Sequence, residues 1–109
     1  MKKLYTAVIA VMALSVIGTA VLLLFMPDTI PAHYNFAGEV DRFGSKYENL
    51  IFPAFTIVPT VIFLLVAKSR GKKNDKVTEK FLLYTALGMA LFFMAEGFYF
   101  MIKGLQYDP

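Results

Sequence analysis

The sequence predicts an all-α integral membrane protein with three transmembrane helices, and three long apolar runs carry that prediction. Residues 4–26 and 49–67 contain no charged side chain, and residues 81–102 contain one, Glu96. A helix needs roughly 20 mostly apolar residues to cross the hydrocarbon core of a bilayer. Only 17% of the residues are charged, against about a quarter in soluble domains. We therefore expect a single membrane domain over residues 1–109.

The first apolar run is expected to be a retained transmembrane helix over about residues 4–26, not a cleaved signal peptide. A signal peptide has an apolar region of about 7–15 residues followed by small residues at the cleavage site. This run has 23 residues and ends in large side chains before Pro27, which stops the helix. Ser15 and Thr19 lie four residues apart, so we expect another helix to pack along them.

Residues 27–46 form a 20-residue loop between the first two helices, and we expect this extracellular loop to be ordered. Loops of this length are usually functional or disordered, and apolar anchors argue against disorder. The anchors are Ile30, Tyr34, Phe36, Val40 and Phe43. The alternation predicts an extended stretch with its aromatic side chains on the helix ends and with His33 and Asn35 on the opposite side. A tight turn is expected at Gly38, which suits a left-handed backbone.

The second helix is expected over about residues 47–67, after a capping box at Ser45 and Glu48. In a capping box the Ser45 hydroxyl accepts from the Glu48 amide, and the Glu48 carboxylate reaches back to the Ser45 amide. Pro53 and Pro59 fall inside this helix, and each is expected to remove a backbone hydrogen bond and kink it.

The basic residues predict the orientation of the chain in the membrane. Six lie in residues 68–80, the expected cytoplasmic loop, and Lys2 and Lys3 add two more. Lys and Arg concentrate on the cytoplasmic side of short membrane loops, so we expect a multi-pass plasma-membrane protein with a cytoplasmic N-terminus and an extracellular C-terminus. The third helix should begin near residues 75–76, cross the membrane over about residues 81–102 and end at Gly104.

Within the third helix, Ala86 and Ala90 form a second pair of small residues suited to helix packing. Glu96 is the one ionisable residue in the apolar runs, which makes it a candidate functional residue. Its carboxyl group can be protonated, can pair with Lys103, or can hydrogen-bond the outer loop. The loop partners considered are Lys46, Asn35 and His33.

The polar residues of the chain give no signature of an enzyme. There is no Cys, so thiolate chemistry and disulfides are excluded. We find no nucleophile–base pair, phosphate loop or metal signature and expect no cofactor. His33, Glu39 and Asp41 are weak metal-ligand candidates, and a hydrogen-bonded structural network is favoured over a metal site. The net charge of +3 is explained by topology, so no nucleic-acid partner is expected.

The outer loop contains a recognisable pattern of residues. Its members are Pro27, Ile30, Pro31, His33, Asn35, Gly38, Glu39 and Asp41, followed by Gly44, Ser45 and Lys46. This pattern resembles the N-terminal module of the SdpI family, which is also catalogued as a domain of unknown function. The resemblance covers about half of the chain and suggests a short three-helix member without the family's second helical module. It implies a role in immunity to a secreted toxic peptide and in relaying that peptide's presence to a cytoplasmic repressor.

Two functions from different classes follow as expectations. The first is a non-enzymatic immunity or signalling protein whose outer loop binds a ligand or peptide or forms a structural cap. The motif residues for this role are Pro31, His33, Asn35, Gly38, Glu39, Asp41, Gly44 and Lys46. The alternative is an accessory or self-assembling membrane subunit, with a homo-oligomer or a larger membrane protein as partner. An ion- or metal-handling role ranks below both.

Overall fold

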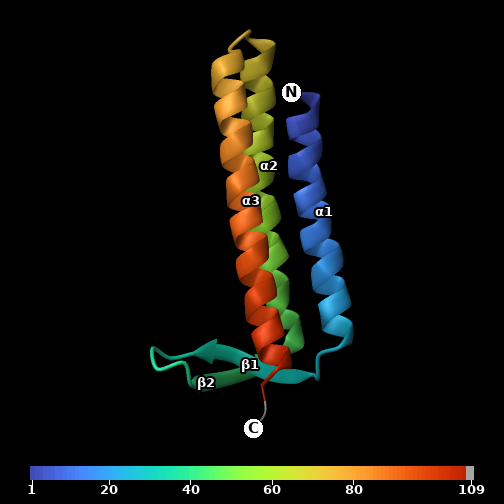
Figure 1. Ribbon diagram of the computed structural model, residues 1–109, viewed down its shortest axis with the longest axis vertical. Coiled ribbons are helices and arrows are strands. Elements are labelled where there is room, and N and C mark those ends of the chain that lie inside the picture. Colours follow the sequence, from blue (N-terminus) through green and yellow to red (C-terminus); the bar gives the residue numbers. More distant parts are fainter. Residues whose placement is uncertain (108–109) are drawn as a thin grey trace.

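The structure is a computed structural model that describes residues 1–107, with three long helices side by side and a β-hairpin across one end (Figure 1). The helices are α1 (Lys2–Leu24), α2 (Ile51–Lys72) and α3 (Lys76–Leu105). Strands β1 (Thr29–Tyr34) and β2 (Val40–Ser45) and the short 3₁₀ helix η1 (Lys46–Leu50) connect α1 to α2. The prediction of an all-α protein is therefore only approximate, because the outer loop forms an antiparallel strand pair.

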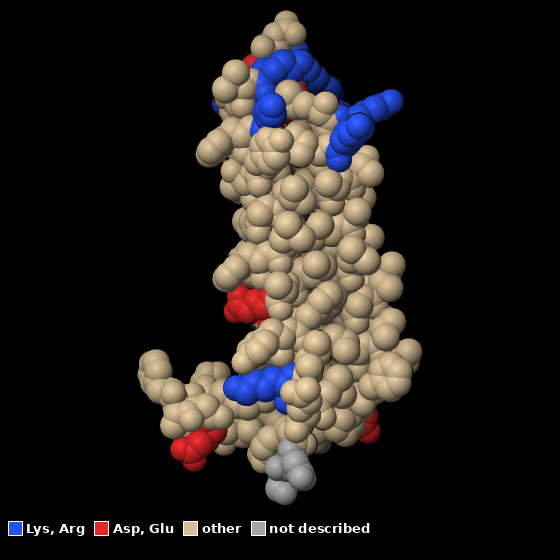
Figure 2. All heavy atoms as spheres, in the orientation of Figure 1, with Lys and Arg blue, Asp and Glu red and all other residues tan. Residues whose placement is uncertain are grey.

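All three helices are long and apolar enough to cross a membrane, which is compatible with a multi-pass protein. Figure 2 shows a broad uncharged surface along the bundle, with most of the Lys and Arg side chains of this face at the end opposite the hairpin and a smaller basic group near the hairpin. One acidic patch interrupts this uncharged surface on the face shown. The N-terminus and the α2–α3 turn lie at the basic end, and the hairpin lies at the other end (Figure 1).

Small side chains line the seams between the helices, as predicted. On α1, Ser15 and Thr19 are buried with exposures of 1% and 2%, and on α3 Ala86 and Ala90 are fully buried. Small residues let helix backbones approach closely, which favours packing inside a membrane. These stripes are therefore used within the chain, between its own helices.

The connection between α2 and α3 is much shorter than the sequence suggested. A loop over residues 68–80 was expected between the membrane spans. Instead α2 continues to Lys72, α3 begins at Lys76 near its predicted start, and only residues 73–75 join the two helices. Asn74 has a φ angle of 62°, a left-handed conformation that reverses the chain. The carboxylate of Asp75 then caps α3 by accepting a hydrogen bond of 3.1 Å from the Thr78 amide.

The start of the second helical segment also differs from the prediction. Ser45 does act as a cap, but its hydroxyl accepts from the Tyr47 amide at 3.2 Å and not from Glu48, because the first turn is a 3₁₀ helix. Pro53 falls in the first turn of α2, where a missing amide removes no helical hydrogen bond. Of the two prolines, only Pro59 lies inside the helix.

Candidate functional site: the hairpin and the cleft beneath it

The hairpin is held against the ends of the helices by an apolar cluster. Ile30 on β1 is 2% exposed and packs with Leu23, Met26 and Met101. The rings of Tyr34 and Phe100 meet edge to face with centroids 5.5 Å apart. Phe43 on β2 contacts Tyr107 in the same way at 5.6 Å. These anchors confirm that aromatic side chains of the loop rest on the helix ends.

Phe36 does not follow this pattern. The alternation predicted that its ring would lie on the helix ends with the other aromatic residues, but it is fully exposed in the hairpin turn. The hairpin extends sideways beyond the bundle (Figure 1), so its turn has no helix beneath it. The prediction for Phe36 was wrong because alternation defines a face of a strand but does not show how far the strand runs past its support.

Asn35 organises the turn of the hairpin. Its side-chain oxygen accepts hydrogen bonds from the amides of Ala37 (3.0 Å) and Glu39 (2.9 Å). Its backbone amide donates to the Glu39 carbonyl, and its carbonyl accepts from the Gly38 amide. Gly38 has a φ angle of 80°, which confirms the expected left-handed turn position. Asn35 and Gly38 therefore have structural roles.

His33 and Asp41 meet across the two strands. The His33 Nδ1 atom lies 2.7 Å from the Asp41 Oδ1 atom, and both side chains are largely exposed. Glu39 does not join them, and residues 1–107 contain no group of three or more His, Cys, Asp or Glu side chains placed to hold a metal ion. The pair therefore links the strands, as expected for a hydrogen-bonded structural network.

The other motif residues support the base of the hairpin. Pro31 is buried on β1 opposite Phe43. The Lys46 ammonium donates to the Leu23 carbonyl at 3.3 Å and so ties η1 to the end of α1. Gly44 lies against the Glu48 carboxylate, and a Cβ atom at this position would collide with it. The motif thus explains the folding of the hairpin more directly than it explains ligand binding.

Glu96 lines a cleft of about 340 Å³ between the underside of the hairpin, the start of α2 and the end of α3. Its carboxylate is exposed, and it makes no hydrogen bond or ion pair with any other residue in the described part of the chain. The cleft walls are mostly apolar. They are formed by Ile30, Ala32, Ile51, Phe52 and Phe100, together with Arg42, Glu48 and Asn49.

None of the predicted partners of Glu96 contacts it. Lys103 lies seven residues further along α3, but its ammonium sits over the Tyr34 ring, 4.1 Å from the centroid. The Lys46 ammonium donates a hydrogen bond to the Leu23 carbonyl at the end of α1. The Asn35 side chain accepts hydrogen bonds in the turn, and the His33 ring pairs with Asp41. The predictions of pairing with Lys103 and of a hydrogen bond to these loop residues were therefore wrong, because each of these side chains has a closer partner.

Of the two acidic residues that line the cleft, Glu48 has an ion-pair partner and Glu96 has none among residues 1–107. The Arg42 Nη2 atom lies 2.9 Å from the Glu48 Oε1 atom, and this hydrogen-bonded carboxylate raises the pKa of Arg42. Glu48 is thus neutralised by Arg42, whereas Glu96 has no counter-charge among residues 1–107. Arg42, Phe52 and Phe100 were not predicted as site residues. Only the fold brings Arg42 of β2 and Phe52 of α2 to Glu96, whereas Phe100 lies one helical turn from Glu96 on α3 itself.

Two polar side chains at or near the cleft differ in their hydrogen bonding. The Asn49 amide donates to the Lys46 carbonyl at 2.9 Å and lies 3.6 Å from the Met26 sulfur atom. Burial raises the pKa of Tyr34, whose hydroxyl has no hydrogen-bond partner among residues 1–107. The cleft therefore has a mostly apolar wall and one carboxyl group, Glu96, without an ion-pair partner among residues 1–107.

Comparison with known proteins gives a partial match over the same region. Residues 10–57, from α1 through the hairpin to the start of α2, match a domain of unknown function (DUF1648). The chain is also similar to an uncharacterized protein of Archaeoglobus fulgidus, with 42% identity over 69 residues. The match covers 56% of this chain and 37% of that protein, so the chain spans little more than a third of its relative. No solved structure matches.

Proposed function

We propose that this chain is a non-enzymatic membrane protein that binds a cationic amphipathic peptide at its hairpin end, in the manner of SdpI-type immunity proteins. The observation that carries the proposal is the unneutralised carboxylate of Glu96 in a mostly apolar cleft. An ionised group at membrane depth is costly unless a partner compensates its charge. A bound basic side chain with apolar neighbours provides that partner.

The walls of the cleft favour such a ligand over a bare ion. The rings of Phe52 and Phe100 pack at a tilt of 49° with centroids 5.3 Å apart, and they offer apolar surface beside Glu96. Arg42 and Glu48 already satisfy each other at the same cleft, so they add little net charge. Peptide sites commonly combine an apolar groove with a few polar groups that define orientation.

The motif in the hairpin supports the same proposal from the sequence side. Its resemblance to the SdpI family implies a secreted peptide as ligand. The proposal places the hairpin outside the cell and the basic end in the cytoplasm, because Lys and Arg favour the cytoplasmic side. In this orientation a secreted peptide reaches the cleft directly.

The proposal is tested by peptide binding to the full chain in nanodiscs. The probe is a fluorescent Leu/Lys amphipathic peptide, with empty nanodiscs of the same lipid as background. We expect Glu96→Gln to weaken binding by about tenfold or more, because a desolvated charge pair is lost. The matched control is Glu39→Gln, which removes an exposed acid in the hairpin that does not line this cleft.

The two variants separate a specific site from general charge attraction. If Glu96→Gln and Glu39→Gln bind the peptide equally well, the cleft is not the site and the proposal fails. Loss of resistance to a secreted peptide in cells that carry Glu96→Gln would extend the result to immunity.

Self-assembly is a second candidate function, and the same carboxylate favours it. Glu96 is exposed on the bundle surface, so a neighbouring copy or a larger membrane protein can also supply its partner. The small-residue stripes do not favour this candidate, because they are buried inside the bundle. A mass measurement in mild detergent tests it: a strict monomer rules out a homo-oligomer, and an oligomer that dissociates with Glu96→Gln supports one.

A further inference from the structure

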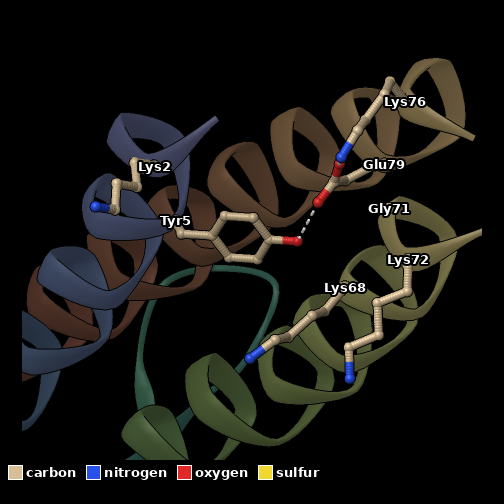
Figure 3. A pocket seen from close by; sticks show the side chains of 7 residues that line it. All are labelled: Lys2, Tyr5, Lys68, Gly71, Lys72, Lys76 and Glu79. Carbon is tan, nitrogen blue, oxygen red and sulfur yellow. Dashed lines mark hydrogen bonds and ion pairs between the residues drawn. The ribbon is translucent and has the colours of Figure 1, made fainter. Parts of the chain in front are cut away.

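A second pocket lies at the basic end of the bundle, far from the hairpin, and all three helices line it. It has a volume of about 460 Å³. Its lining residues are Lys2, Tyr5, Lys68, Gly71, Lys72, Lys76 and Glu79. Figure 3 shows Tyr5 reaching from one helix toward Glu79 on another, with Lys76 beside the Glu79 carboxylate and with Lys68 and Lys72 on the third helix.

The floor of this pocket is a buried carboxylate. The Glu79 side chain is 8% exposed, and its Oε2 atom accepts a hydrogen bond of 2.7 Å from the Tyr5 hydroxyl. The Lys76 ammonium lies 3.6 Å from Oε1 of the same carboxylate, and this oxygen accepts no hydrogen bond from residues 1–107. A Cβ atom on Gly71 would lie 2.5 Å from the carboxylate, so the bare glycine lets α2 close over Glu79.

The rim of the pocket carries an excess of positive charge. Four lysines and one carboxylate line the pocket, and only Lys76 is paired with that carboxylate. Lys2, Lys68 and Lys72 form no ion pair with any residue in the part of the chain that the structure describes. An ammonium group is a compact charge with three donors, which suits a phosphate oxygen. The rim is thus able to hold an anion that the protein itself does not supply.

The position of the pocket along the bundle indicates where such an anion comes from. Lys68 directly follows the apolar residues of α2, and Lys2 and Tyr5 lie in the first turns of α1. The lysines therefore lie where the apolar surface gives way to the basic end (Figure 2), the depth at which lipid phosphates lie. Basic pockets between membrane helices are suited to lipid headgroups.

We propose that this pocket binds a phosphate group, presented by the headgroup of an anionic phospholipid. Lys68 and Lys72 on α2 bind the phosphate, and Lys2 on α1 adds positive charge at the rim. The Tyr5–Glu79 hydrogen bond holds α1 to α3, and the close approach of Gly71 to Glu79 holds α2 to α3. The site is independent of the cleft at Glu96 and of the function proposed for it.

The test is lipid binding to the purified full chain in neutral detergent, followed by native mass spectrometry. Short-chain phosphatidylglycerol is the probe, and short-chain phosphatidylcholine and inorganic phosphate are titrated separately. We expect the double variant Lys68→Gln, Lys72→Gln to bind phosphatidylglycerol about tenfold more weakly than the unaltered chain. The control is Lys73→Gln, Lys80→Gln, which removes the same charge from lysines that do not line the pocket.

The outcomes distinguish the source of the phosphate and can overturn the site. Retention of phosphatidylglycerol in millimolar inorganic phosphate supports a lipid headgroup, and competition by inorganic phosphate supports a free phosphate at the same lysines. Equal weakening in both double variants shows only a general charge effect and overturns the proposal. Unchanged binding in the pocket variant also overturns it.

Discussion

At each end of the bundle a glycine lies against a glutamate carboxylate, but one carboxylate is exposed and the other is buried. At the hairpin end, Gly44 lies against the carboxylate of Glu48, and at the basic end Gly71 lies against that of Glu79. Glu48 is 43% exposed and pairs with an exposed arginine, whereas Glu79 is 8% exposed and bonds a tyrosine hydroxyl. In both places a close glycine makes room for an acid. We expect the exposure of that acid to determine how much it stabilises the fold.

Exposure matters because it decides what happens to a carboxylate that loses its partner. An exposed ion pair is screened by water and contributes little to stability. A buried carboxylate that loses its partner stays away from water and remains uncompensated. We therefore expect substitutions at the basic end to cost more than equivalent substitutions at the hairpin end.

The largest effect is expected from Gly71→Ala. The added methyl group would press on the buried Glu79 carboxylate, and overpacking of this kind costs about 1–3 kcal/mol. Unfolding in mixed detergent–SDS micelles measures the change. At the hairpin end, Gly44→Ala should have a smaller effect, because Glu48 is free to turn toward water.

Gly88→Ala is the matched control for this substitution. Gly88 also lies in a helix, but no atom lies within 4 Å of an added Cβ, and alanine favours a helix by about 1 kcal/mol over glycine. It should leave stability unchanged or raise it. A larger loss for Gly44→Ala than for Gly71→Ala would reverse the comparison between the two ends.

An intermediate effect is expected for the hydrogen bond between Tyr5 and Glu79. A double-mutant cycle with Tyr5→Phe and Glu79→Gln should give a coupling of about 0.6–2 kcal/mol, the range for hydrogen bonds between membrane helices. The same unfolding assay measures it. The parallel cycle with Arg42→Gln and Glu48→Gln should give a smaller coupling that weakens with added salt. Equal couplings at both ends would contradict the role assigned to burial.

The smallest expected effect is a change in the stability of the fold with pH, caused by Asp75 at the N-terminal cap of α3. Hydrogen bonds from the Thr78 side chain and then from its amide hold the pKa of Asp75 below its usual value. Its stabilising contribution is therefore complete above about pH 4, the unfolded value, and is lost as the pH falls through the lower folded value. Unfolding curves across this range should show a loss at acid pH. Asp75→Asn keeps a capping side chain but should remove this part of the pH dependence.

The three helices were predictable from the sequence because an apolar run of about 20 residues is typical of a membrane-spanning helix. The start of α3 and the turn at Gly38 were predicted for local reasons, a change of composition and a glycine that tolerates positive φ. Pairing of β2 with β1 was not predicted, since residues 40–45 show no clear alternation. The end of α2 in the basic segment was missed because residues 68–72 were assigned to a loop, although Lys and Arg are good helix formers.

The sites were harder to predict than the fold. Tyr5 and Glu79 are 74 positions apart, so their hydrogen bond has no local signature. Glu96 was identified as important by its place in an apolar run, but its neighbours Arg42 and Phe52 come from other elements. Spacing along α3 suggested Lys103 as its partner, and the fold instead places that ammonium over Tyr34. Spacing along a helix predicts which residues share a face of that helix. It does not predict that a residue of another element will attract one of them, as Tyr34 attracts Lys103.

The short connection over residues 73–75 has a consequence for how the chain assembles after synthesis. Contacts between segments close in sequence form with the least loss of chain entropy. We therefore expect α2 and α3 to associate first as a helical hairpin, and α1 to dock against them after β1 and β2 pair. The first helix is then the last to dock, and a chain stalled before this step would leave the Glu79 carboxylate without its Tyr5 partner.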